Sequence, residues 1–326
     1  MRILHKNTFM ATALSMLFAL PWSGSATAQE LALLDQNALS PETSFNAPHL
    51  IYRNNLLPIS QTPLDVSMQE NAIIRNAALR SEIAYVQDLE SSTVLYEKNS
   101  QEVRPIASIT KLMTALVVTE AGQDMSEMLE ITEADIDRLK FSSSRLSVGA
   151  RLSRADMLHL ALMSSENRAA NALGRYYPGG LAAFVRAMND KARALGMRQT
   201  QFVEPTGLSS DNVSSPRDLV KLLARTKTQP LIHQYTTQGQ YSVQVGRGRE
   251  LLFNNTNRLV KNSNWDILVS KTGFINEAGE CLVMLTRIED RDVAIVLLNS
   301  NGRYSRIGDA VRIRDLVEKS NGLAML

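Results

Sequence analysis

Ser108 and Lys111 are the residues of this chain whose types and spacing best fit a nucleophilic reaction. They lie in the run Ser108-Ile109-Thr110-Lys111, the only place where a lysine follows a serine by three positions. On a helix, residues three apart share a face, so the hydroxyl and the amine can meet. The lysine can deprotonate the serine only if burial or a nearby positive charge lowers its pKa towards neutrality. A helix-capping serine followed by a surface lysine would have the same spacing.

Two further short motifs follow in the sequence. Ser165-Glu166-Asn167 lies between an apolar segment and a helix-like segment, and Lys271-Thr272-Gly273 comes at the end of a strand-like run. A second lysine beside the first would supply the positive charge that lowers its pKa. Ser-x-x-Lys, Ser-x-Asn and Lys-Thr-Gly in this order resemble the signature of the active-site serine penicillin-recognising enzymes, which comprise penicillin-binding proteins and serine β-lactamases.

Ser210-Asp211-Asn212 is a competing match to the middle motif. We prefer Ser165 because it directly follows an apolar helix, as a loop supported by the core should. Ser210 lies in the run Gly207–Ser215, which leads into a helix N-cap and is typical of a turn.

Longer stretches narrow the resemblance to the D-alanyl-D-alanine endopeptidases, low-molecular-mass penicillin-binding proteins of the penicillin-binding-protein-seven type. The similarity runs from about Ser81 to Lys319. It implies that the substrate is the peptide cross-link of peptidoglycan, cut between D-alanine and the side-chain amine of diaminopimelate, and that β-lactam antibiotics acylate the enzyme. The stretches that carry it are residues 104–108, 160–170, 202–208 and 271–274.

The resemblance implies a role for each residue of the first two motifs. Ser108 would attack the D-alanyl carbonyl and form an acyl-ester intermediate, with Lys111 as its general base. Ser165 would relay a proton between Lys111 and the leaving amine. Asn167 would orient Lys111 and the substrate amide.

The third motif is implied to bind the substrate. Lys271 would add positive charge, and Thr272 would offer its hydroxyl to a substrate or β-lactam carboxylate. Gly273 would leave room for an acyl-peptide along the strand. The backbone N–H groups of Ser108 and Phe274 would form the oxyanion hole. No metal or cofactor is expected.

Three other functions are compatible with parts of this pattern. A D-alanyl-D-alanine carboxypeptidase would use the same chemistry on a different leaving group. The 53 residues after Gly273 are expected to form two strands and a helix, and no amphipathic anchor is visible in them, which favours the endopeptidase. A β-lactamase would need a Glu-x-x-Asn loop before Lys-Thr-Gly, and Glu204 and Glu250 lack that context. A non-catalytic wall-binding or β-lactam-sensing module would not require three intact motifs.

The other residues that could do chemistry do not form a recognisable site. The chain has no Gly-x-Ser-x-Gly elbow and no His-Glu-x-x-His motif, which argues against an α/β-hydrolase and a zinc peptidase. His159, within an apolar helix face, is expected to be a partly buried structural histidine. Cys281 lies in an apolar run and is expected to be a packed strand thiol.

The elements that must position these motifs come from both ends of the chain. We predict an α+β transpeptidase-like fold, with an antiparallel sheet of about five strands covered by helices and a mainly helical subdomain inserted at about residues 123–260. A groove between the two parts is the expected site. Strands are predicted at 83–88, 93–96, 266–270, 281–287 and 293–299, and helices at 108–120, 154–163, 168–177, 181–195, 217–225 and 305–319.

Length, composition and the N-terminal sequence indicate the domain organisation, the cellular location and the classes of partner. The chain has 326 residues, 44% hydrophobic and 21% charged, with a net charge of +2. Residues 1–28 resemble a cleaved signal peptide and hold the whole basic excess, so we expect export to the periplasm, with no nucleic-acid partner and no integral membrane segment after cleavage. Residues 29–78 are expected to be an extension or linker, and 79–326 the peptidase domain.

Overall fold

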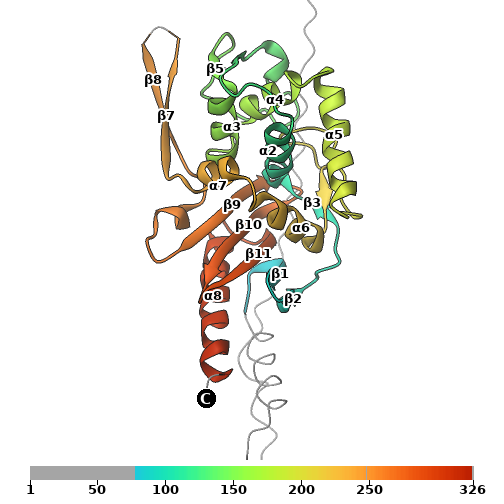
Figure 1. The fold of residues 1–326 in the computed structure, drawn as a ribbon, viewed down its shortest axis with the longest axis vertical. Coiled ribbons are helices and arrows are strands. Elements are labelled where there is room, and N and C mark those ends of the chain that lie inside the picture. The colour runs from blue at the N-terminus through green and yellow to red at the C-terminus, as the bar shows by residue number, and fades with distance from the viewer. Residues whose placement is uncertain (1–77, 247, 325–326) are drawn as a thin grey trace, which may run out of the picture. The chain divides into compact units, whose positions relative to one another are not determined.

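A five-stranded antiparallel sheet organises the protein, as the sequence predicts. The computed structural model describes residues 78–246 and 248–324; the predicted signal peptide and nearly all of the predicted extension lie outside them. The strand order is β2-β1-β11-β10-β9, so the first and last strands of the described residues pair inside the sheet (Figure 1). The strands are β1 (Ser81–Asp88), β2 (Val94–Lys98), β9 (Asp266–Ile275), β10 (Gly279–Ile288) and β11 (Arg291–Ser300).

Alternating apolar side chains bury both faces of this sheet. In β10, Cys281 and Val283 point into one hydrophobic cluster, whereas Leu282 and Met284 point into the other. This period of two is what a sheet covered on both faces requires. Helix α8 (Ser305–Ala324) covers the second face, and α6 (Pro216–Thr226) packs on the first.

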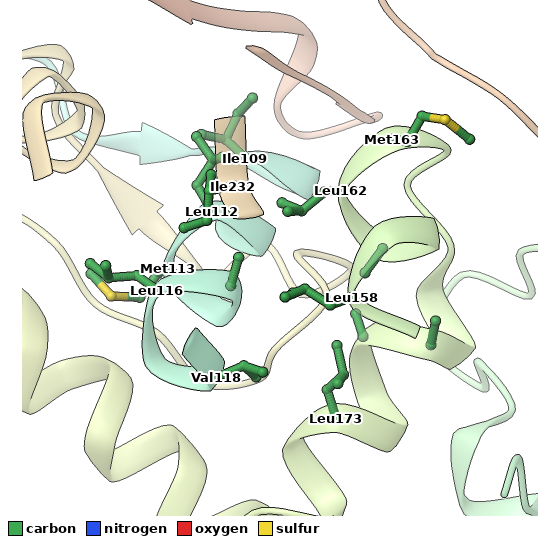
Figure 2. Close-up of a cluster of buried hydrophobic side chains, with 14 of the residues drawn as sticks. Ile109, Leu112, Met113, Leu116, Val118, Leu158, Leu162, Met163, Leu173 and Ile232 are labelled. Atoms are coloured by element: carbon green, nitrogen blue, oxygen red, sulfur yellow. The ribbon is translucent and has the colours of Figure 1, made fainter. Parts of the chain in front are cut away.

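Helix α2 (Thr110–Glu120) is the centre of the helical part, and its residues from Thr110 to Val118 are all buried. Because it is enclosed on every side, its position is determined by the helices around it (Figure 2). Ser153 and Ser215 cap α3 and α6, each accepting a backbone N–H bond. The surrounding helices are α3 (Arg154–Met163), α4 (Asn167–Arg175), α5 (Gly180–Ala194) and α7 (Pro230–Thr237).

The middle of the chain is mainly helical, but its C-terminal end holds a β-hairpin that the sequence patterns did not lead us to expect. Residues 240–254 form a hairpin of β7 (Gln240–Val245) and β8 (Arg249–Asn254), which projects beside α3 in Figure 1. Alternate residues of both strands, such as Val243 and Phe253, are buried, which is a strand period and not a helix period. Shorter pieces complete the described chain: β3 (Arg104–Pro105) with β6 (Val213–Ser214), β4 (Met128–Glu130) with β5 (Arg151–Ser153), and the 3-10 turns η1 (Ala107–Ile109), η2 (Glu133–Asp135) and η3 (Arg258–Lys261).

Two predictions about single residues are confirmed by burial. Cys281 is fully buried in β10, and burial raises the pKa of its thiol to about 11. His159 is stacked between the rings of Tyr235 and Tyr241, and burial lowers the pKa of its imidazole to about 4, so it stays neutral.

None of the helices in the described part of the chain combines the length and hydrophobicity that crossing a membrane requires.

Candidate active site

Ser108 lies in a constrained turn directly before α2. The sequence predicts that the helix begins at Ser108, whereas the structure has the 3-10 turn η1, here called the Ser108 turn (residues 107–109), and the α-helix begins at Thr110. Ala107 has a φ of 46°, a left-handed conformation that cannot continue an α-helix. Such strain persists only where neighbouring structure enforces it. The Ser108 turn therefore presents a partly exposed hydroxyl in a fixed position.

Lys111 is completely buried beneath that turn. Its Nζ lies 2.9 Å from Ser108 Oγ, 2.7 Å from Asn167 Oδ1 and 2.6 Å from the carbonyl oxygen of Thr206. Burial lowers the pKa of Lys111 to about 8, although three carboxylates oppose this shift. Those carboxylates belong to Glu204, Glu166 and Asp137.

Ser165 and Asn167 connect the two lysines. Ser165 Oγ accepts a hydrogen bond from Lys271 Nζ at 2.9 Å, and Asn167 Oδ1 accepts one from Lys111. Ser165 has a φ of 62°, another left-handed residue, which turns its side chain out of α3 before α4 begins. Asn167 is itself fixed, because its Nδ2 donates to Ser142 Oγ at 2.9 Å. The structure thus brings all four residues together.

Lys271 stands within β9 rather than at its end. The sequence predicts a strand that stops before Lys271, but the ladder with β10 continues through Gly273 to Ile275 because these residues pair with residues 279–283. Lys271 is 1% exposed. Burial lowers its pKa well below the ordinary value, with further lowering by Lys111 and Arg306. For both lysines burial is the larger cause of the lowered pKa, and repulsion between the two amines is secondary.

Gly273 lies where the strand touches the Ser108 turn. A Cβ at this position would stand 3.0 Å from the Ile106 carbonyl oxygen and 3.1 Å from the backbone nitrogen of Ser108. A side chain here would push the Ser108 turn away by a few tenths of an ångström, so a glycine suits both this close packing and an extended ligand. Its carbonyl accepts a hydrogen bond from Arg306 Nη1 at 2.9 Å, and Thr272 Oγ1 donates to Thr256 Oγ1 at 2.7 Å.

Phe274 is the exposed end of the motif. Its side chain is 57% exposed and lines an open hollow of about 880 Å³ at the end of the sheet, together with Glu280 and Arg303. Ser108 does not line this hollow. Ser108 instead faces the neighbouring stretch of β9 at Gly273.

Asn212, from the competing motif, has a structural environment. It is fully buried, its Oδ1 accepts a hydrogen bond from the Val203 backbone at 2.7 Å, and its Nδ2 donates to Thr110 Oγ1 at 3.1 Å. Both side-chain atoms are used to hold the chain together. The structure brings Ser165, from the preferred motif, next to Lys271.

Three further residues near the site belong to none of the three motifs. Thr206 provides the carbonyl that accepts from Lys111, Ser142 supports Asn167, and Arg306 adds charge beside Lys271. The stretch 202–208 belongs to the resemblance, which marks the region of Thr206 but not its carbonyl. Ser142 and Arg306 lie in segments that come close to the motifs only when the chain folds.

Among the described residues, no group of three or more His, Cys, Asp or Glu is arranged to hold a metal ion.

Comparison with known proteins assigns the chain to a family. The family model described as D-alanyl-D-alanine carboxypeptidase, Peptidase_S11, matches residues 69–302. Curated proteins named D-alanyl-D-alanine endopeptidase are 48% identical, from Pseudomonas aeruginosa over 74% of this chain and 78% of theirs, and from Escherichia coli over 72% and 76%.

Solved structures agree with this assignment. The Streptomyces K15 DD-transpeptidase superposes with a TM-score of 0.69 at 26% identity, covering 73% of this chain and 97% of that one. Penicillin-binding protein D2 from Listeria monocytogenes in its ampicillin-bound form gives a TM-score of 0.64 at 29% identity, covering 74% and 98%. The chain belongs to the Peptidase_S11 family of serine D-alanyl-D-alanine peptidases.

Proposed function

We propose that this protein is a serine D-alanyl-D-alanine endopeptidase that hydrolyses D-alanyl-diaminopimelate cross-links of peptidoglycan and is acylated by penicillins. The observation that carries the proposal is the contact between the Ser108 hydroxyl and the buried amine of Lys111. The substrate class is supported by the 48% identity to relatives named D-alanyl-D-alanine endopeptidase.

The hydrogen bonds of Lys111 fit a general base. A neutral amine has two N–H groups and one lone pair. The two N–H groups donate to Asn167 Oδ1 and the Thr206 carbonyl oxygen, which leaves the lone pair for the proton of Ser108. Ser108 Oγ then attacks the D-alanyl carbonyl carbon, and its proton passes to Lys111.

Ser165 is suited to the second proton transfer. As the amide C–N bond breaks, the leaving amine needs a proton, which Ser165 would deliver from the lysine pair because its hydroxyl contacts Lys271. The products are a free amine and an ester on Ser108. Water then attacks the ester carbonyl, which releases the D-alanyl peptide and restores the Ser108 hydroxyl.

The oxyanion hole is assigned to the backbone N–H groups of Ser108 and Phe274. The close approach of the Ser108 nitrogen to Gly273, next to Phe274, supports this pairing. Each such donor contributes about 3–4 kcal/mol to stabilising a tetrahedral intermediate in comparable enzymes. Thr272 would offer its hydroxyl to the carboxylate of a substrate or β-lactam.

The nucleophile is tested with a fluorescent penicillin. The purified protein should become covalently labelled, and Ser108→Ala should lose all labelling because no ester can form. Ser164→Ala is the matched control. Ser164 precedes Ser165 in the sequence, and its hydroxyl donates to the Leu160 carbonyl oxygen, so this variant should label normally. A Ser108→Ala protein that labels like wild type would refute the assignment.

The reaction is tested with purified muropeptides and mass spectrometry. Cross-linked dimers should be converted to monomers. The second candidate is a D-alanyl-D-alanine carboxypeptidase, which the description of the family model favours. Release of D-alanine from pentapeptide monomers with dimers left intact would establish that activity instead.

The site of action follows from the substrate. Peptidoglycan lies outside the cytoplasmic membrane, and residues 1–28 resemble an export signal, so we assign the protein to the periplasm. Fractionation of cells that express the full chain should recover a shortened protein in the periplasmic fraction. Recovery of the full-length protein from the cytoplasm would contradict this.

A further inference from the structure

Glu204 lies in the loop of residues 203–212, behind the Ser108 turn, and both oxygens of its carboxylate accept hydrogen bonds. Oε1 accepts from the Gly207 backbone at 2.6 Å and from Asn212 Nδ2 at 2.9 Å. Oε2 accepts from the backbone of Thr206 at 2.6 Å and also from its hydroxyl. A carboxylate with donors on both oxygens fixes the path of the chain around it.

The same loop contacts the reacting groups at two points. The carbonyl of Thr206, two residues after Glu204, accepts the 2.6 Å bond from Lys111 Nζ. Gly207 packs directly on the Ser108 turn, since a Cβ there would lie 1.9 Å from the Ala107 carbonyl oxygen. Any shift of the loop would therefore move the acceptor of the lysine and the support of the serine together.

We propose that Glu204 is a positioning residue for proton transfer from Ser108 to Lys111, because its carboxylate holds the Thr206 carbonyl against the lysine amine. This inference rests on the function proposed above, in which Lys111 is the general base. It adds to that function a charged residue that does not contact the substrate but controls the base.

The charge of Glu204 also acts on Lys111. Three carboxylates raise the pKa of Lys111 against the lowering by burial, and Glu204 has the largest effect of the three. The other two are Glu166, at the N-cap of α4, and Asp137, which accepts from Ser142; on the remaining side stands Lys271. Removing the charge of Glu204 should therefore lower the pKa of Lys111 further.

The same bonds explain why Glu204 is not a β-lactamase base. A carboxylate that activates water needs an oxygen free to accept the water's proton. Both oxygens of Glu204 already accept from the loop. The penicilloyl ester on Ser108 should accordingly persist.

The test is the pH dependence of acylation by fluorescent penicillin in wild type, Glu204→Gln and Glu204→Asp, with folding checked by thermal melting. The acid limb is the part of the profile in which the acylation rate rises with pH. In Glu204→Gln this limb should move to lower pH, because a lysine of lower pKa is neutral at lower pH. The alkaline plateau should fall about tenfold to a hundredfold, because the amine is no longer held in line. Glu204→Asp keeps the charge on a shorter side chain, so its acid limb should stay in place while its plateau falls.

Asp211→Asn is the matched control. Asp211 is an exposed acid of the same loop, and its removal should leave both the limb and the plateau unchanged. A folded Glu204→Gln protein with a wild-type limb and plateau would refute the proposal. If Glu204→Gln does not fold, a wild-type plateau in Glu204→Asp would refute it. A wild-type protein that labels only at residues other than Ser108 would instead refute the proposed function itself.

Discussion

At the scale of single residues, the protein buries two amines that water would keep protonated. Lys111 is fully buried and Lys271 is 1% exposed, and no carboxylate forms an ion pair with either among the described salt bridges. Burial without an ion pair favours the neutral amine. Burying the two lysines costs stability of the folded state, and it keeps the pKa of Lys111 close enough to neutral pH for this residue to act as a base.

The pH profile follows from this arrangement. With a pKa of about 8, Lys111 is mostly protonated at pH 7, and only the neutral amine can accept the proton of Ser108. The rate of penicillin acylation should rise about tenfold per pH unit below pH 8 and level off above it. Lys111→Arg should remove this dependence together with about three orders of magnitude of rate, because the guanidinium cannot act as a general base. A rate that is constant between pH 6 and pH 9 would contradict the assignment of the base.

At the scale of elements, the Ser108 turn is held between β9 and the loop of residues 203–212. Gly273 and Gly207 are the two contact points, and both leave space that a side chain would fill. The local sequence predicts a helix from Ser108. Contacts from two distant segments shift the start of α2 to Thr110 and hold Ala107 in a left-handed conformation.

Gly207→Ala should be strongly destabilising, and Gly196→Ala is its matched control. Both glycines have a positive φ, 84° and 70°, so both substitutions incur backbone strain of about 1 kcal/mol. Only at Gly207 would the new Cβ clash, 1.9 Å from a backbone oxygen, whereas nothing lies within 4 Å at Gly196. Urea denaturation should therefore give a loss for Gly207→Ala that exceeds the control by about 2 kcal/mol or more. Equal losses would contradict the close packing of the loop on the turn.

At the scale of the whole molecule, the sheet joins the two ends of the peptidase unit. Beyond the pairing of β1 with β11, Asp309 of α8 accepts hydrogen bonds from the Ser81 backbone at 2.7 Å and from the Ser81 hydroxyl at 2.6 Å. These residues are 228 positions apart. The site therefore depends on an assembly that is complete only when the last helix has been made.

Asp309→Ala should destabilise the whole fold. The substitution leaves the buried N–H of Ser81 without its acceptor, which costs about 1–3 kcal/mol. The Ser81 hydroxyl loses one partner and keeps its contact with Ser300 Oγ at 2.6 Å. Asp315→Ala, an exposed acid of the same helix, should change stability by less than about 0.5 kcal/mol. Urea midpoints measured in parallel check both values, and an unchanged midpoint for Asp309→Ala would contradict the structural role of this residue.

Local sequence patterns are sufficient to predict the elements that depend on short-range contacts. The caps at Ser153 and Ser215 follow from side chains that bond the next turn of the chain, and the three C-terminal strands follow from apolar runs. The hairpin at residues 240–254 was missed, although its alternating apolar residues carry the signal. The extension of β9 through Lys271-Thr272-Gly273 was missed because pairing with β10, not local preference, decides it.

The chemistry was determined in part by sequence and in part by tertiary structure. The spacing of Ser108 and Lys111 is local, so their contact could be predicted from helical geometry. The contact between Ser165 and Lys271, 106 residues apart, depends on how the helices pack on β9. The pKa of each lysine depends on burial, and the role inferred for Glu204 on a loop folded around its carboxylate. Burial and long-range contact are properties of the packed molecule, so neither can be predicted from a local stretch of sequence.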